Sequence, residues 1–460
     1  MSWKQAFWLK SEDYCFMSNM VKLRDLCLRI TDGSHYSPPA AEAGYPMLSS
    51  KDMEDTDFDY SNVNYISEDE YKKMVSSGCK PQKNDVLIIK DGNSYLQKVF
   101  VVTEDKEIAL LSSIGIIRPD LTKLDPYYLR YYLLSDFVKH EVAKKYVTGS
   151  ALPRIILQNF GDIDIPYVSL PEQKRVVSVL KDIDSKISIN KSAIVDLNAM
   201  SKLLYDYWFV QFDFPDEHGK PYKSSGGRME WNAELKREIP AGWNAQKISE
   251  LITTERGISY STPNIQSGKG VPMLNLATFW PGGGDYKSDG LKYFLGEYPK
   301  SKVLAPYDLV MCNTQQTAIK FETDIIGRAM LVPDIFDGDV VFSHHVNVIR
   351  PAISSLKYYL LYLFNSDYFH KYIAGFTNGT NILGLSFNGV EDYKVEIPPT
   401  VLLEKFGEVI LSVEKKKSAI IKENSQLASL RDFLLPMLMN GQVKVSTEEA
   451  VGSQIGGAPC

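Results

Sequence analysis

The stretch Leu170–Phe209 decides the fold, and it reads LPEQKRVVSVLKDIDSKISINKSAIVDLNAMSKLLYDYWF. Apolar or small residues recur there in alternating steps of four and three, and Asn190 and Ser201 are the polar breaks in this seam. Such a heptad repeat is typical of a helix that packs along a second helix. Pro171 suits the first turn, where a missing N–H costs nothing. We predict one helix about 55 Å long, which needs a partner because isolated helices are marginally stable.

A second stretch, Leu402–Leu438, repeats the pattern with a poorer seam, because Lys417, Asn424 and Arg431 take core-type positions. One interpretation is two unrelated helices, each packed on its own domain. The sharper hypothesis is an antiparallel pair in which Asn190 faces Asn424, since two facing asparagines fix register at some cost in stability. The residues expected in this helix-pair interface are Leu180, Ile183, Ile187, Asn190, Ile194, Leu197, Leu204, Ile410, Val413, Ile420, Asn424, Leu427 and Leu434.

Composition places the chain among ordinary globular proteins. Its 460 residues favour about three domains, and 44% hydrophobic and 23% charged residues are usual for a soluble protein. Five scattered cysteines without a CxxC spacing argue against disulfides or structural zinc and favour a reducing, cytoplasmic location. No apolar run is long enough for a membrane span, and the first residues lack a signal-peptide pattern. The net charge of −6 neither indicates nor excludes nucleic-acid binding, because a local basic patch can suffice.

The two halves of the chain resemble each other in order. Short strings recur at a nearly constant offset: Tyr45–Leu48 at Val271–Leu274, Asp85–Ile88 at Asp308–Met311, and Ile116–Pro119 at Val348–Pro351. The long helices align at an offset of 230 residues. This distance is too long for a solenoid and indicates a duplicated unit of one globular domain followed by one long helix. The expected fold class is α+β, with two similar mixed α/β domains separated by two long antiparallel helices in a coiled coil, a pseudo-two-fold internal repeat.

Boundaries follow from this duplication and from the Pro- and Gly-rich stretch between the halves. The expected parts are a first globular domain at 1–168 with an N-terminal extension at 1–19, a first helix at 169–212, a linker at 213–243, a second globular domain at 244–398, a second helix at 399–440 and a C-terminal tail at 441–460.

The motifs expected of an enzyme are missing from the sequence. There is no GxxxxGK[ST] loop for ATP, no Asn/Asp-Pro-Pro-aromatic string of an adenine methyltransferase and no HExxH. His344 and His345 fall in an expected strand, where they would point to opposite faces and make poor joint metal ligands. The chain is therefore expected to be non-catalytic and to hold no metal or cofactor of its own.

Several motifs carry a resemblance to a known family. The segments Leu170–Arg175 and Tyr207–Pro215, which open and end the first helix, resemble the central helical region of Type I restriction-modification specificity (S) subunits. Ile239–Trp243 is similar to the lead-in to that family's second target recognition domain, and Leu430–Leu438 is similar to its C-terminal end. Thr31–His35 resembles a motif near the start of many first domains. The likeness covers about residues 20–445, although Pro399–Lys405 departs from the usual helix start.

The resemblance implies a DNA-reading subunit of a larger complex. Each target recognition domain is expected to read one half of a bipartite site in double-stranded DNA, and the helices set the unread spacer. The helices are also expected to dock two methyltransferase (modification) subunits, with restriction/translocase subunits joining through the complex. S-adenosylmethionine, ATP and Mg are expected in the partner subunits.

Residues that touch bases are sought among polar and basic side chains on expected loops, because these match base edges in the major groove. Asn313–Gln316 attracts most weight, since four polar residues follow an expected strand and would be presented by a loop. The run Lys415–Lys417 is expected to be a solvated face that could also meet phosphate. The DNA-contact candidates are His35, Ser37, Lys90, Asn93, Lys98, Arg154, Asn313, Thr314, Gln315, Gln316, Lys320, His344 and Asn381.

Two other functions stay open at this point. The chain could be a scaffold whose coiled coil is the function and whose globular domains bind something other than DNA. It could also be the specificity subunit of a fused methyltransferase-nuclease system. Binding to a methyltransferase and salt-sensitive binding to a split DNA site would separate the first of these from the DNA-reading subunit.

Overall fold

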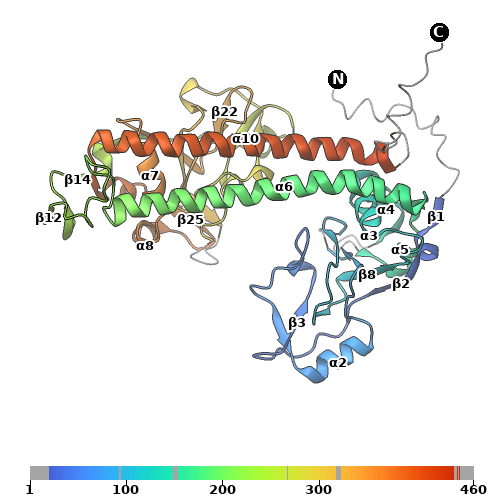
Figure 1. The fold of residues 1–460 in the computed structure, drawn as a ribbon. Helices are drawn as coiled ribbons and strands as arrows, with labels where there is room; N and C mark the ends of the chain where they lie inside the picture. Colours follow the sequence, from blue (N-terminus) through green and yellow to red (C-terminus); the bar gives the residue numbers. More distant parts are fainter. Residues whose placement is uncertain are drawn as a thin grey trace, which may run out of the picture. The chain divides into compact units, whose positions relative to one another are not determined.

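The computed structural model describes residues 20–92, 95–148, 154–266, 268–316, 323–439, 443 and 445. These residues group into two units. The first comprises the described residues of Met1–Ile187 and Gln426–Cys460, and the second is Ser188–Ser425. Each unit holds one globular domain together with one segment of each long helix, drawn in green and red in Figure 1.

The two long helices are as extended as their seams predict. Helix α6 (Leu170–Tyr205) has 36 residues and continues into a π-helical turn at Asp206–Val210, and helix α10 (Thr400–Met439) has 40. At the start of α6, the Glu172 carboxylate accepts hydrogen bonds from the backbone N–H and the hydroxyl of Ser169. This pairing satisfies a backbone donor at the helix terminus.

In each unit, segments of α6 and α10 lie side by side (Figure 1). In the second unit, Asn190 Nδ2 donates to Asn424 Oδ1 at 2.8 Å, and the rings of Trp208 and Phe406 are 5.8 Å apart. The contact of Trp208 with Phe406 lies further along α6 and its π-helical turn but earlier along α10 than the contact of Asn190 with Asn424, so the two segments are antiparallel. In the first unit, Arg431 of α10 donates to Asp184 of α6 at 3.0 Å. The predicted antiparallel pair is confirmed, and independent packing of the two helices is excluded.

The residues expected in the helix-pair interface are turned away from solvent. Along the middle of both helices all of them except the buried Asn190 are half-buried, as expected of a two-helix seam without a third layer. Those that are buried or half-buried are Leu180, Ile183, Ile187, Asn190, Ile194, Leu197, Leu204, Ile410, Val413, Ile420, Asn424, Leu427 and Leu434.

The first globular domain is built on a four-stranded sheet in the order β2-β8-β5-β6 and a three-stranded sheet in the order β4-β3-β7. Its strands are β1 (Met20–Lys22), β2 (Cys27–Asp32), β3 (Tyr45–Leu48), β4 (Asn64–Ile66), β5 (Val86–Ile89), β6 (Val99–Val101), β7 (Ala109–Leu110), β8 (Ile114–Pro119), β9 (Val147–Thr148), β10 (Arg154–Ile155) and β11 (Asp164–Pro166). Its helices are α2 (Glu68–Ser76), α3 (Pro126–Leu134), α4 (Asp136–Tyr146) and α5 (Leu157–Gly161).

Strand β5 is buried on both faces, which explains its uninterrupted apolar sequence. Val86 and Ile88 share a core with α3 and with Leu180 of α6. Leu87 and Ile89 point the other way into a separate core. The sheet is therefore held against the helix pair on one face and against the rest of its own domain on the other.

The second globular domain has the same plan, with four-stranded sheets in the orders β15-β23-β19-β21 and β17-β16-β22-β18. Its strands are β12 (Met229–Asn232), β13 (Arg237–Pro240), β14 (Asn244–Lys247), β15 (Ile252–Arg256), β16 (Val271–Leu274), β17 (Lys292–Phe294), β18 (Val303–Leu304), β19 (Leu309–Cys312), β20 (Thr314–Gln316), β21 (Ala329–Leu331), β22 (Val340–Phe342), β23 (Val346–Pro351), β24 (Thr377–Asn378), β25 (Ile382–Leu385) and β26 (Lys394–Ile397). Its helices are α7 (Leu356–Phe364), α8 (Asp367–Ala374) and α9 (Asn388–Glu391).

The duplication expected from the sequence extends to topology. The order β2-β8-β5-β6 of the first domain corresponds to β15-β23-β19-β21 of the second, and the pair β1-β11 corresponds to β14-β26. Helices α3 and α7 both have nine residues and begin 230 positions apart. The expected α+β class with an internal repeat is confirmed.

The expected linker at 213–243 is a folded segment, which corrects the prediction. Strands β12 and β13 form a hairpin, and the rings of Phe214 and Trp243 lie 5.4 Å apart in the core at the end of α6. Its Pro and Gly residues mark turns between these elements rather than an open tether. The sequence pattern failed here because the aromatic residues that fold the segment are few and widely spaced.

No helix in the described part of the chain combines the length and apolar character that a membrane span needs. This agrees with the absence of a long apolar run in the sequence.

Candidate nucleic-acid interface

A glycine fixes the same close backbone approach in both domains. Gly33 follows β2, and a Cβ placed on it would lie 2.2 Å from the carbonyl oxygen of Leu110. Gly257 follows β15, and its Cβ would lie 2.2 Å from the carbonyl oxygen of Ser343. Neither position can carry a side chain without moving the backbone. The contact holds the end of the edge strand beside the loop that enters the neighbouring strand.

Polar side chains of the first domain gather at this end of the sheet. Lys90 directly follows β5, and its ammonium lies 3.2 Å from the Asp91 carboxylate and 3.4 Å from that of Asp32. His35 Nε2 lies 3.2 Å from the same Asp32 carboxylate. We call Asp32, His35, Lys90 and Asp91 the first polar cluster. Lys90 is buried and engaged by carboxylates, so it does not present a free positive charge as the sequence analysis expected.

The remaining first-domain candidates fall into three groups. Ser37 is exposed near His35, and the backbone of Arg154 lies in β10, where the N–H of Ile155 donates to the carbonyl of Lys90 at 3.0 Å. Lys98 turns away from the cluster, because its ammonium donates to the carbonyl of Met53 at 2.6 Å and lies 3.1 Å from Glu54. Asn93 is outside the described residues.

The second domain places amides and imidazoles at the equivalent point. Asn313 directly follows β19, and its side-chain amide donates to the carbonyl of His344 at 3.2 Å and to the side-chain oxygen of Asn347. Arg256, the last residue of β15, donates to the carbonyl of His344 at 2.6 Å. We call Arg256, Asn313, His344, His345 and Asn347 the second polar cluster.

The two histidines lie in the turn between β22 and β23, not in a strand, and their ring centres are 3.9 Å apart. The expectation that they point to opposite faces was wrong, because the strand ends before them at Phe342. His345 Nδ1 lies 2.7 Å from the Thr314 hydroxyl. Burial and the nearby His344 lower the pKa of His345 to about 4, so its ring is neutral at pH 7.

Gln315, one of the most heavily weighted candidates, is buried within the second domain. Its side-chain oxygen accepts hydrogen bonds from the N–H groups of Ile325 and Ile326 at 2.7 and 3.1 Å. Its side-chain nitrogen donates to Asp324 at 2.7 Å. Thr314–Gln316 forms strand β20 paired with β25, so the expected open loop is instead part of a sheet. Asn313, Thr314 and Gln315 are all buried, and their internal bonds support the site rather than face solvent.

Three candidates of the second domain remain. Asn381 is exposed and directly precedes β25, the strand that pairs with β20. Gln316 belongs to β20, and its side chain is outside the described part, as is Lys320 altogether. The structure therefore brings the backbone of Gln316 close to that of Asn381, since Gln316 pairs with the next residue, Ile382.

Replacing Gln315 by alanine should destabilise the second unit by about 1–3 kcal/mol, because two backbone N–H groups and the Asp324 carboxylate lose a buried partner. The loss reflects the burial of Gln315, which was expected on an exposed loop. Urea unfolding of the purified protein measures the effect. The matched control is Gln266→Ala, which changes the same residue type at an exposed position of the second domain and should leave the unfolding midpoint unchanged.

Repeat alignment pairs the members of the two clusters. Lys90 and Asn313 each follow the central strand, and the backbone N–H of each donates an equivalent hydrogen bond, to the carbonyl of Ser113 or of His345. Asp32 and Arg256 each end the edge strand, paired with Gly115 and Asn347. One backbone scaffold thus carries an acidic and basic set in the first domain and an amide and imidazole set in the second.

Four members of these clusters were not predicted from the sequence: Asp32, Asp91, Arg256 and Asn347. The signal that could have found them was the internal repeat, since the offset that aligns β5 with β19 also places Lys90 on Asn313. Contacts made by residues far apart in sequence, such as Arg256 with His344, leave no local pattern.

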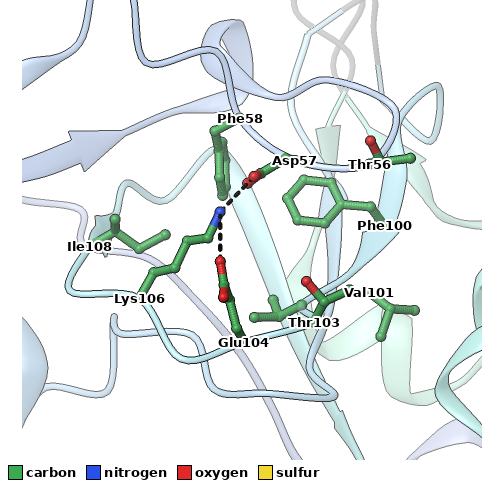
Figure 2. Close-up of a pocket in the computed structure, with 10 residues that line it drawn as sticks. Thr56, Asp57, Phe58, Phe100, Val101, Thr103, Glu104, Lys106 and Ile108 are labelled. Atoms are coloured by element: carbon green, nitrogen blue, oxygen red, sulfur yellow. Dashed lines mark hydrogen bonds and ion pairs between the residues drawn. The ribbon is translucent and has the colours of Figure 1, made fainter. Parts of the chain in front are cut away.

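A cavity beside β6 offers no alternative site for a small molecule (Figure 2). Its volume is about 10 Å³, which is room for a single water. Lys106 points across it toward Asp57 at 2.5 Å and Glu104 at 3.7 Å, as the dashed lines in Figure 2 mark. Among the described residues, no group of three or more His, Cys, Asp or Glu side chains is arranged to hold a metal ion.

Comparison with known proteins shows which proteins this chain is similar to. A family profile described as the Type I restriction modification DNA specificity domain matches residues 18–199. The Type I restriction enzyme MjaIX specificity subunit of Methanocaldococcus jannaschii is 25% identical over 68% of this chain and 68% of its own. The MjaVIII specificity subunit of the same organism is 23% identical over 84% of this chain and 86% of its own.

A solved structure is also similar over most of the chain. The S subunit of a Type I restriction-modification system from M. genitalium aligns with a TM-score of 0.48 and 15% identity, over 91% of this chain and 95% of that one. The curated relatives are specificity subunits, so they agree with the expectation of a non-catalytic chain. Together with the motifs that open and close α6, the profile and the relatives show that the chain is similar to Type I restriction-modification specificity subunits over most of its length.

Proposed function

We propose that each globular domain reads one half of a bipartite site in double-stranded DNA, and that the helix pair sets the spacer between the halves. The observation that carries this is the pair of polar clusters: one scaffold, repeated, with different side chains at equivalent points. A repeated scaffold presents equivalent edges to equivalent features of a duplex. Different side chains at these edges match different bases.

The chemistry of the two clusters suggests how the half-sites differ. Carboxylates accept hydrogen bonds from the amino group of cytosine, and arginine pairs with guanine edges. The first cluster has Asp32 and Asp91 around one ammonium, and the second has the exposed Arg256 beside two buried amides that support it. The non-DNA scaffold is disfavoured by the names of the relatives.

We propose that two methyltransferase subunits dock on the helix pair, one on each unit. In the second unit, Met200 and Leu203 of α6 are 67% and 66% exposed. In the first unit, Leu430 and Phe433 of α10 are 45% and 52% exposed. These pairs lie 230 positions apart and are therefore equivalent in the repeat. Exposed apolar pairs are typical of interaction sites, and equivalent sites favour two copies of one partner.

Changing Met200 and Leu203 together to serine should remove one methyltransferase subunit from the complex, and so should changing Leu430 and Phe433. Mass measurement by size-exclusion chromatography with light scattering reads out the loss. Val409→Ser is the matched control, since Val409 is an exposed residue of α10 outside both pairs and should retain two subunits. Retention of two subunits by both double variants would contradict the docking surfaces.

S-adenosylmethionine, ATP and Mg are proposed to bind partner subunits, and restriction/translocase subunits are proposed to join through the methyltransferases. We also propose a cytoplasmic location, where the host DNA lies. The free thiols of Cys27, Cys79 and Cys312 suit such a reducing compartment.

A further inference from the structure

An ion cluster inside the second unit joins α10 to the globular domain. The ammonium of Lys417 lies 2.9 Å from the Asp285 carboxylate and 2.9 Å from that of Glu414. Asp285 belongs to the domain, and it also accepts a hydrogen bond from the Asn198 amide of α6 at 2.5 Å. The Lys417 side chain is only 4% exposed, so the expectation of a solvated Lys415–Lys417 face was wrong for this residue. Both long helices are thus tied to one carboxylate of the domain.

The first unit has a counterpart built from different residues. Asp184 of α6 accepts hydrogen bonds from Arg431 of α10 at 3.0 Å and from the Tyr131 hydroxyl of the domain at 2.8 Å. Asp184 and Glu414 lie 230 positions apart, so a carboxylate occupies the same repeat position in both helices. The repeat equivalent of Arg431 is Ser201, which is too short to reach across, and the second unit uses Lys417 of the same helix instead.

Such an ion cluster contributes more to the fixed position of the domain on the helices than to the free energy of folding. Desolvation of buried charges offsets most of their attraction, and apolar residues of similar size often support folding as well. Charged hydrogen bonds, however, have fixed lengths and directions, whereas apolar surfaces can slide. An ion cluster between helix and domain therefore restricts the angle at which the domain is held.

We propose that Asp285, Lys417 and Glu414 are positioning residues that hold the second domain at one angle on the helix pair and thereby determine which spacer length is accepted. This proposal rests on the proposed function. These three residues are not proposed to contact bases. We therefore expect them to affect the spacing that is accepted between the half-sites and not the bases that are read within each half-site.

The test uses the full-length protein with its methyltransferase subunits and DNA that carries its two half-sites at the normal spacing or with one or two base pairs added or removed. The variant joins Lys417→Met, Asp285→Asn and Glu414→Gln, which removes the charges at nearly constant size. We expect the ratio of methylation rates at normal and altered spacing to fall roughly tenfold. The ratio for base changes inside the second half-site should stay as in the wild type.

Two further proteins make the result decisive. Lys422→Met removes an exposed pair with Asp337 on the same helix and should leave the spacing ratio unchanged. Asn198→Ala removes one support of Asp285 without touching the charges and should lower the ratio roughly threefold. If circular dichroism finds the triple variant unfolded, the spacing ratio of Asn198→Ala tests the proposal in its place.

If the triple variant is folded and keeps the wild-type spacing ratio, the proposed positioning role of Asp285, Lys417 and Glu414 is wrong. If the triple variant is unfolded, an unchanged spacing ratio for Asn198→Ala contradicts that role instead. Failure of the wild type to methylate a bipartite site at any defined spacing would instead overturn the proposed function, so the two failures are distinct.

Discussion

Lys417→Met alone should destabilise the second unit by about 3–5 kcal/mol, because it leaves the Asp285 and Glu414 carboxylates buried without their cation. This is the penalty of breaking a buried ion cluster, not the net value of the intact one. Urea unfolding of the wild type and variant measures it. Adding Asp285→Asn and Glu414→Gln to Lys417→Met removes the stranded charges and should recover most of the loss.

The loss should also depend on pH. Burial raises the pKa of Glu414 above its ordinary value of 4.5, while Lys417 acts to lower it. Without Lys417, the folded-state pKa lies still higher, so folding carries the full penalty of an ionised carboxylate above that pKa. The penalty shrinks as the pH falls through the folded-state pKa toward 4.5 and the carboxyl takes up a proton. The difference between wild type and variant should therefore be larger at pH 8 than at pH 5.5, and an equal difference would contradict this account of the cluster.

Phe406→Ala should cost about 3–5 kcal/mol, because it removes a fully buried ring from the aromatic core at the junction of the two helices with the second domain. The Phe406 ring lies 4.9 Å from that of Phe209 and 5.8 Å from that of Trp208. These residues come from α10 and from the π-helical turn after α6, so the cavity would weaken the end of the helix pair.

The matched control is Phe433→Ala on the same helix, where the side chain is 52% exposed. It should change the free energy of unfolding by less than about 1 kcal/mol. Thermal unfolding separates the two, with a fall in Tm of roughly 10 °C expected for Phe406→Ala. Equal effects at the two positions would mean that the aromatic core does not secure the helix junction.

The parts of the fold that were predictable are those with local periodicity. The heptad seam placed Asn190 opposite Asn424, and these side chains share a hydrogen bond. The constant offset between the halves predicted a shared topology, which the matching strand orders bear out. Both signals arise because burial of one helix face, or of one strand, leaves a regular trace in the sequence.

The parts that were not predictable depend on contacts between distant residues. Gln315 looked like a loop residue, and its burial follows from β25 and from Asp324–Ile326, which no local pattern announces. Lys417 is a charged residue at a core-type position of the seam, and its partner Asp285 is distant in sequence, so the sequence did not reveal the ion pair.

The DNA-contact candidates stay predictions, and the structure gives only their positions. His35, Lys90 and Asn313 lie in the two polar clusters at the ends of the sheets. Lys98 binds the carbonyl of Met53 and has no part in the cluster. Which of the polar residues meet bases stays a prediction, since burial of Lys90 and Asn313 favours a supporting role for both.

The central claim is that the paired helices hold two different readers a set distance apart along DNA. The most direct test inserts one heptad into both helices at the level of Asn190 and Asn424 and maps methylated adenines in cells that contain the protein and its methyltransferase. A heptad keeps the seam in register and adds about 10 Å of helix. The account predicts the same two half-sites with a longer spacer, by up to roughly three base pairs. An unchanged spacer, with both half-sites still methylated, would contradict it.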